Sequence, residues 1–243
     1  MDRLLLLLPT TTYRTQAFVD AARALGVDLV CASERPSTLE DLAPDRLLTL
    51  DFGNPDAAAA TVEAFARRRP ITAVGAVDDA TAVAAAAIGE RLGLGGNVVA
   101  AVSATRDKHR MRQCLAAAGV PGPRFRRIAL GEDPFQAARG VGFPCVLKPL
   151  ALSASRGVIR ADNVDQFIAA FKRIAGLLAR DDVRVTGEAA SHLLAEEFIP
   201  GVEVALEGLL LGSKLRTLAL FDKPDPLDGP FFEETIYVTP SRL

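Results

Sequence analysis

The sequence predicts an α/β unit built on a doubly wound parallel sheet, followed by an α+β unit. Two observations indicate this fold class. From residue 1 to about 104, short apolar runs alternate with turns and stretches of helical period, which is typical of a parallel sheet covered by helices. Beyond Pro121 and Pro123, which mark a linker, strands become dense and only two helices are expected between them.

The N-terminal pattern contains four expected strands and three expected helices. Apolar runs predict strands at residues 4–8, 27–31, 47–50 and 71–77, and helical periods predict helices at residues 13–25, 56–69 and 80–92. Gly26 and Gly93 end the first and third of these helices. The first strand meets Pro9 at once and is shorter than the apolar region of a signal peptide.

The glycines within residues 93–96 partly resemble the glycine-rich fingerprint of dinucleotide-binding proteins. Such a fingerprint follows a strand, whereas this cluster follows a predicted helix. We therefore expect a helix stop and a turn here, and an NAD-dependent dehydrogenase is disfavoured.

The second pattern begins with a predicted helix over residues 108–118, which Gly119 ends. Strands are expected at residues 125–130, 145–148, 157–160, 193–198, 202–211 and 215–221, and helices at residues 134–141 and 164–179.

Composition narrows the choice of partners. Lys and Arg total 28 against 30 Asp and Glu, so no net basic field attracts nucleic acid or an anionic membrane, and small soluble partners are expected. No run approaches the ~20 apolar residues of a membrane helix. Cys31, Cys114 and Cys145 have no metal-ligand spacing, and we expect three buried, reduced thiols and a cytoplasmic protein.

Four short segments carry the residues that suggest a function. Each alone is a weak signal, because a lysine at a helix start or strand end is usually a surface charge and a serine-rich loop is usually a turn. The segments are residues 107–112 (DKHRMR), 144–149 (PCVLKP), 153–158 (SASRGV) and 196–203 (EEFIPGVE). In this order they resemble the ATP-grasp superfamily, which includes D-alanine:D-alanine ligase, biotin carboxylase, glycinamide ribonucleotide synthetase and the L-amino acid ligases.

The resemblance covers nearly the whole chain and implies its organisation. A pre-ATP-grasp domain would span residues 1–105, a linking helix residues 106–120, a lid residues 121–192, and the beginning of the larger ATP-grasp domain residues 193–243. The sheets of the lid and the larger domain would clasp ATP between them. By the same likeness, a homodimer through the N-terminal domain is expected.

The resemblance also implies a reaction. A carboxylate would attack the γ-phosphate of ATP, and an amine would then displace phosphate from the acyl phosphate to form a carbon-nitrogen bond. The alternative is a catalytically inactive nucleotide-binding or regulatory module of the same family. ADP release that requires both a carboxylate and an amine distinguishes the two.

Lys108 and Lys148 match the two lysines that bind ATP phosphates in the family, and they are the expected catalytic residues. Phosphoryl transfer depends mainly on positioning and charge neutralisation, so cations beside the phosphates are required. One lysine 4 Å from a phosphate charge contributes roughly 4 kcal/mol at an effective dielectric near 20, before desolvation is subtracted.

The loop over residues 153–157 matches the phosphate-covering loop of the family. Hydroxyls and backbone N-H groups suit phosphate oxygens, so Ser153, Ser155, Arg156 and Gly157 are expected to contact ATP. Family loops are often richer in glycine. Since Ala154 stands within this one, a stiffer loop is expected.

Residues 196–203 match the strand that binds adenosine. The likeness assigns adenine contacts to Glu196, Phe198 and Ile199 on a strand that also carries Glu197, and ribose contact to Glu203. Carboxylates accept hydrogen bonds from hydroxyls and from an exocyclic amine. A surface strand ending in a Pro-Gly turn would leave Glu203 unexplained.

The likeness places Mg²⁺ on a later acid and a Glu-x-Asn pair, but no such pair follows Glu203. We therefore expect the metal ligands beyond Leu243, in which case this chain resembles an N-terminal portion that binds nucleotide weakly and is inactive alone. Near the end, Glu234 is expected to bind a substrate ammonium and Arg242 a carboxylate, with Tyr237 beside them. The alternative for this stretch is an exposed loop with a charged rim.

Overall fold

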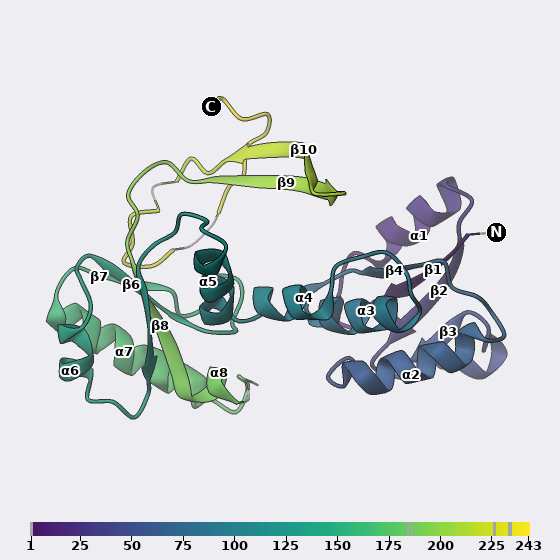
Figure 1. Ribbon diagram of the computed structural model, residues 1–243, viewed down its shortest axis with the longest axis horizontal. Coiled ribbons are helices and arrows are strands. Elements are labelled where there is room, and N and C mark those ends of the chain that lie inside the picture. The colour runs from purple at the N-terminus through teal and green to yellow at the C-terminus, as the bar shows by residue number, and fades with distance from the viewer. Residues whose placement is uncertain (1, 184, 186, 226, 233–234) are drawn as a thin grey trace. The chain divides into compact units, whose positions relative to one another are not determined.

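The chain forms two compact units, Met1–Arg106 and Asp107–Leu243, named here the N-terminal and C-terminal units. The computed structural model describes residues 2–183, 185, 187–225, 227–232 and 235–243. Each unit has its own sheet and its own hydrophobic core (Figure 1). Among the described residues, no helix has the length and apolar character needed to cross a membrane.

The sheet of the N-terminal unit is parallel throughout, as predicted. Its strands are β1 (Arg3–Leu7), β2 (Asp28–Ser33), β3 (Leu47–Thr49) and β4 (Ala73–Ala76), in the order β3-β2-β1-β4. Successive side chains of a strand point to opposite faces. Leu5 and Leu7 therefore enter the larger core, while Leu6 joins a smaller cluster on the other face.

Helices cover both faces of this sheet, which confirms the doubly wound class. They are α1 (Thr15–Ala24), α2 (Pro55–Ala66) and α3 (Asp79–Arg91). Figure 1 shows α1 on one side of the sheet and α2 and α3 on the other. The start of α2 is set locally, because the Asn54 side chain accepts a hydrogen bond from the Ala57 N-H at 3.2 Å and Pro55 needs no partner there.

The glycine cluster at residues 93–96 ends a helix as predicted, whereas the helix that follows it was not predicted. Gly93 has a φ of 65° and ends α3 in a turn, so the glycine cluster is a helix stop as expected. A further helix, α4 (Val99–Thr105), was not predicted. Its start has no local cap; instead the Glu90 carboxylate accepts from the Val99 N-H at 2.7 Å, a tertiary contact that the local sequence does not signal.

The C-terminal unit is built on a four-stranded antiparallel sheet. Its strands are β5 (Phe125–Ala129), β6 (Cys145–Pro149), β7 (Ile159–Ala161) and β8 (His192–Glu197), in the order β5-β8-β6-β7. The predicted helices α6 (Pro134–Arg139) and α7 (Val164–Leu178) share one core with the sheet. The predicted boundary between the lid and the larger domain, at residue 192, placed β8 in the larger domain. In the structure, β8 is instead a central strand of the sheet that also contains β5, β6 and β7.

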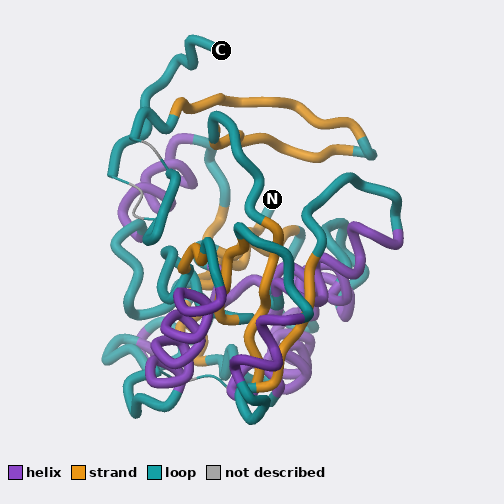
Figure 2. The backbone as a smooth tube through the Cα atoms, turned by 90° about the vertical axis from the view of Figure 1, so that its left-hand side faces the viewer, coloured by secondary structure: helices purple, strands orange, loops and turns teal. Residues whose placement is uncertain are grey.

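Two helices and a hairpin complete this unit: α5 (Lys108–Ala117), the short α8 (Glu188–Ser191), which was not predicted, and the strands β9 (Val204–Leu211) and β10 (Lys214–Asp222). Figure 2 shows the hairpin as a long two-stranded ribbon. Gly212 and Ser213 at its turn both have positive φ, 52° and 62°, as a type I′ turn requires. The register shifts between Thr217 and Ala219, so one extra residue forms a β-bulge.

The expectation of three buried cysteines is wrong for two of them. Cys145 on β6 is buried, Cys31 on β2 is half-buried, and Cys114 is exposed. Cys114 lies on α5, none of whose residues is buried, so its neighbours in sequence shield it poorly. All three thiols are free, and burial raises the pKa of Cys145 to about 12.

Candidate functional site

Two charged residues, Lys148 and Glu196, lie on the face of the C-terminal sheet that is opposite its core. Strand side chains alternate between the two faces. Leu147 and Ala195 point into the core, so their neighbours Lys148 and Glu196 point to the other face. Val146 pairs directly with Glu196, and Lys148 is therefore its diagonal cross-strand neighbour.

Glu196 is held by two cations from different elements. Lys148 Nζ donates to Oε2 at 2.5 Å. Arg112 of α5 donates from Nε to Oε1 at 2.7 Å and from Nη2 to Oε2 at 3.2 Å. Glu196 is only 4% exposed, so the pairing is strong and charge-assisted. Arg112 belongs to the first of the four segments, and the family resemblance implied no role for it.

The pairing determines the ionisation of Glu196. Burial tends to raise the pKa of this carboxyl, but the hydrogen bonds and charges of Arg112 and Lys148 outweigh burial and lower the pKa below its usual value. Glu196 is therefore a fixed negative charge between two positive ones at neutral pH.

A pH-dependent contribution to stability follows. Because the folded-state pKa of Glu196 is lowered, its stabilisation is fully present above the unfolded glutamate pKa of about 4.3 and is lost as the pH falls through the folded value. The test compares the free energies of unfolding of the parent and of Glu196→Gln in urea titrations. We expect the parent's advantage in stability to decrease as the pH falls from about 5 to about 3. A difference that stays constant over this range would contradict the pairing.

The start of α5 is anchored beside the segment that follows β6. Asp107 caps the helix by accepting from the Arg110 N-H at 3.0 Å. The backbone N-H of Lys108 donates to the Leu150 carbonyl at 3.0 Å, and its Nζ donates to the Leu152 carbonyl at 2.5 Å. Lys108 thus lies next to the loop over residues 153–157, as the phosphate assignment requires.

The loop over residues 153–157 adopts positive φ angles, which favour glycine, although Gly157 is its one glycine. Ala154 and Ser155 have φ of 54° and 52°, and Gly157 has 76°. Two tight turns form the loop: the Arg156 N-H donates to the Ser153 carbonyl at 3.3 Å and the Val158 N-H to the Ser155 carbonyl at 3.1 Å. Positive φ is unfavourable for residues with a Cβ, so the loop holds local strain at Ala154 and Ser155.

Gly157 should be intolerant of a side chain. A Cβ there would lie 2.9 Å from Leu177 Cδ2 and 3.0 Å from Pro149 Cγ, at a φ that alanine avoids. We expect Gly157→Ala to destabilise the C-terminal unit by about 1–3 kcal/mol in urea denaturation. The control is Gly176→Ala in α7, where a Cβ meets nothing within 4 Å and should stabilise by up to about 1 kcal/mol. Equal effects of the two substitutions would refute the account of this loop.

A cavity of about 410 Å³ gathers all four sequence segments within the C-terminal unit. This volume lies in the range of small-molecule sites. Predicted site residues on its wall are Lys148, Ser155, Glu196, Glu197, Phe198, Ile199 and Glu203, with Arg112, Leu227 and Phe232 among the further lining residues. The other predicted phosphate residues, Lys108, Ser153, Arg156 and Gly157, do not line this cavity. Arg156 and Gly157 adjoin its wall residues Ser155 and Val158 in sequence.

The wall segment after β8 offers backbone groups to a ligand. The Phe198 N-H donates to the Pro144 carbonyl at 3.1 Å, and the Phe198 ring lies 4.1 Å from the Arg160 guanidinium carbon. Ile199 is exposed, and within the described residues its backbone makes no hydrogen bond. Its N-H and C=O are therefore available to a ligand, and Ile199 lines the cavity.

Glu203 is paired with Lys223, a partner that the sequence pattern did not predict. Val204 pairs with Asp222 across the hairpin, so Glu203 and Lys223 come next and their side chains form an ion pair. Lys223 Nζ also lies 5.4 Å from the centroid of the Tyr237 ring.

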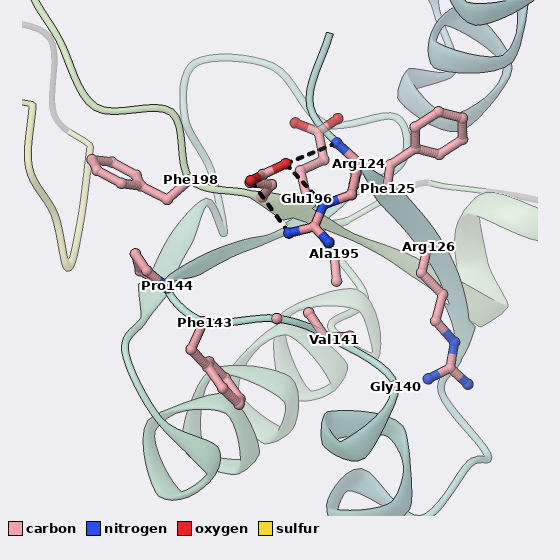
Figure 3. Close-up of a pocket in the computed structure, with 12 residues that line it drawn as sticks. Arg124, Phe125, Arg126, Gly140, Val141, Phe143, Pro144, Ala195, Glu196 and Phe198 are labelled. Carbon is pink, nitrogen blue, oxygen red and sulfur yellow. Dashed lines mark hydrogen bonds and ion pairs between the residues drawn. The ribbon is translucent and has the colours of Figure 1, made fainter.

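Glu197 adjoins a second, smaller hollow of about 210 Å³, shown in Figure 3 with Arg124 at its rim. Arg124 donates from Nε and Nη2 to the Glu197 carboxylate at 3.1 and 3.3 Å. Both side chains are exposed, so this pair contributes little to stability.

Of the expected substrate residues, Tyr237 and Arg242 lie outside the 410 Å³ cavity wall. Tyr237 packs edge-on against Phe221, and the backbone N-H of Arg242 donates to Asp222 at 2.9 Å. Glu234 falls outside the described residues. Among the described residues, no group of three or more His, Cys, Asp or Glu side chains could hold a metal ion.

Two family models match this chain. Residues 19–96 match an ATP-grasp N-terminal domain, and residues 141–243 match an ATP-grasp domain.

Curated relatives include ligases from bacteria. Alanine–anticapsin ligase of Bacillus subtilis is 31% identical over 166 residues, covering 63% of this chain and 34% of that protein. D-alanine–D-alanine ligase of Aromatoleum aromaticum is 31% identical over 150 residues, covering 61% of this chain and 45% of that protein. The chain thus spans less than half the length of these relatives.

Solved structures share the fold. The L-amino acid ligase from Bacillus licheniformis has a TM-score of 0.77 at 24% identity, covering 100% of this chain and 57% of that chain. Carboxyaminoimidazole ribonucleotide synthase from Aspergillus clavatus, complexed with ATP, has a TM-score of 0.63 at 18% identity, covering 93% of this chain and 55% of that chain.

Proposed function

Because the chain belongs to the ATP-grasp superfamily, we propose that its C-terminal unit binds ATP and that the protein is an ATP-dependent carboxylate-amine ligase. The observation that carries this proposal is the single cavity of about 410 Å³ to which four separate sequence segments contribute. These segments supply cations for phosphates and carboxylates for the nucleoside, which together match the chemistry of ATP.

The adenine end would lie against Glu196 and Ile199. A carboxylate has about four acceptor positions, of which Arg112 and Lys148 occupy three, leaving one for the exocyclic amine. The open backbone of Ile199 offers a donor and an acceptor to the edge of the base. Glu203 would accept from the ribose hydroxyls.

The phosphate end would lie between Lys148, Lys108 and the loop over residues 153–157. Ser153, Ser155 and Arg156 offer hydroxyl and guanidinium donors, and Gly157 permits close approach of the backbone. Positioned cations of this kind stabilise the charge that develops on the transferred phosphoryl group.

The proposed chemistry has two steps. A carboxylate oxygen bonds to the γ-phosphorus while the bond from that phosphorus to the bridging oxygen breaks, which forms an acyl phosphate and releases ADP. The amine then bonds to the acyl carbon, phosphate departs, and the amine loses a proton. A closed site would protect the acyl phosphate from water. Family likeness implies Mg²⁺, but the described residues contain no group of three or more His, Cys, Asp or Glu side chains that could hold it.

The substrate class is proposed from the relatives. Their names specify alanine and L-amino acids, so we favour an amino acid as the carboxylate and a second amino acid as the amine. The predicted contacts for it remain Glu234, Tyr237 and Arg242.

The test combines binding with trapping. Calorimetry should detect binding of ATP and ADP to the chain, and incubation with ATP, Mg²⁺, L-amino acids and hydroxylamine should give hydroxamates if an acyl phosphate forms. Hydroxamate or amine-dependent ADP release would support the ligase, whereas nucleotide binding without either agrees both with the inactive nucleotide-binding module and with a chain that is inactive alone. Failure to bind either nucleotide would overturn the proposal.

Ribose recognition gives a separate prediction. If Glu203 accepts from the ribose hydroxyls, 2′-deoxy-ATP should bind about tenfold more weakly than ATP, and Glu203→Ala should remove this difference. The matched control is Glu207→Ala on β9, an exposed glutamate outside the cavity wall. Discrimination that survives Glu203→Ala would show that the ribose assignment is wrong.

A further inference from the structure

Glu196 has two cationic partners, although a single cation would balance the charge of its carboxylate. The two come from elements far apart in sequence, Arg112 from α5 and Lys148 from β6. We infer that Arg112 is a positioning residue: it keeps Glu196 neutralised, so that Lys148 can leave Glu196 for the phosphates of a bound nucleotide. This inference rests on the proposed function, because it assumes that Lys148 contacts phosphate.

In the structure, Lys148 is bonded to Glu196. Its Nζ lies 2.5 Å from Oε2, and the side chain is only 17% exposed. An ammonium held this closely by a carboxylate contributes little net positive charge to the cavity. To neutralise phosphate, Lys148 must lengthen or break this bond.

Arg112 is better suited than Lys148 to remain in place. Its two parallel donors span both carboxylate oxygens, whereas Lys148 makes one bond from a flexible four-carbon stem. The helix that carries Arg112 is also anchored, since Asp107 caps it and Lys108 bonds the carbonyls of Leu150 and Leu152.

The burial of Glu196 makes the second cation necessary. A carboxylate that is 4% exposed is strongly disfavoured without a counter-charge. If a neutral residue replaced Arg112, release of Lys148 would leave the Glu196 carboxylate buried and without a counter-charge. Lys148 would then be locked on Glu196, and the phosphates would lose its charge.

The experiment compares ADP with adenosine by calorimetry in the whole chain. The ratio of the adenosine Kd to the ADP Kd isolates the contribution of the phosphates, because contacts to the nucleoside cancel. In Arg112→Met this ratio should fall about tenfold, and in Arg112→Lys, which keeps the charge but not the paired bonds, by less. In the double variant Arg112→Met with Glu196→Gln, Lys148 has no carboxylate to neutralise, and the ratio should return to within about threefold of the parent.

Arg110→Met provides the control, because Arg110 is exposed on the same helix and should leave the ratio unchanged. An unchanged ratio in Arg112→Met would overturn the role of Arg112. A fall that the double variant does not restore would also overturn it, since Arg112 would then contact the phosphates itself. If the parent binds adenosine and ADP equally, or binds neither, the proposed function fails and the inference fails with it.

Discussion

Replacing Glu196 with alanine should destabilise the C-terminal unit by about 2–4 kcal/mol and weaken ATP binding by about tenfold or more. The substitution leaves Arg112 and Lys148 close together without their shared carboxylate, and breaking a buried ion pair typically costs 3–5 kcal/mol. The lower figure applies because the two cations keep 23% and 17% of their side-chain surface exposed and can be partly rehydrated. Urea denaturation and calorimetry measure the two effects.

The neighbouring residue offers a control for this prediction. Glu197→Ala removes a carboxylate whose pair with Arg124 is exposed, so stability should change by less than about 0.5 kcal/mol. Similar losses of stability in the two variants would show that the burial of Glu196 is not what matters.

Lys148→Ala should weaken ATP binding by about tenfold or more while leaving the fold intact. Lys148 is the proposed phosphate contact, and a tenfold loss corresponds to about 1.4 kcal/mol. Stability should fall by only about 1 kcal/mol, because the two bonds from Arg112 continue to neutralise Glu196. The measurements are calorimetry with ATP and urea denaturation of the same preparations.

The control for Lys148 is Lys172→Ala, which removes an exposed lysine of α7 outside the cavity wall and should leave both quantities unchanged. If Lys148→Ala bound ATP as tightly as the parent, Lys148 could not be the main phosphate contact. Equal losses of affinity in the two lysine variants would instead indicate a non-specific effect of charge.

Periodicity was sufficient to predict most of the fold. The continuous apolar run of β1 and the helical period of α7 are local patterns, and both elements form as expected. The helix α4 was missed because its start depends on Glu90, which lies nine residues earlier. Exposure of Cys114 was missed because free cysteine is usually buried and α5 carries no periodic apolar face.

The partners of the site residues were harder to predict than the residues themselves. Arg112 follows Lys108 by four positions, so both lie on one face of α5, and this spacing was an available signal. Its contact with Glu196, however, joins residues 84 positions apart and depends on how α5 packs.

Lys223 illustrates a different obstacle. From a two-residue turn at Gly212 and Ser213, regular pairing would place Glu203 opposite Asp222, which is another carboxylate. The bulge between Thr217 and Ala219 shifts the register by one residue and places Lys223 there instead. A single extra residue in the strand thus changes a repulsive pair into an attractive one, and no local pattern signals it.

The central claim is that residues 107–243 form an ATP site. A crystal structure of the chain with ADP tests this claim most directly. The account predicts adenine against Glu196 and Ile199, ribose hydroxyls bonded to Glu203, and phosphates within hydrogen-bond distance of Lys148. ADP bound away from the cavity of about 410 Å³, or bound in it with its phosphates remote from Lys148, would contradict the account.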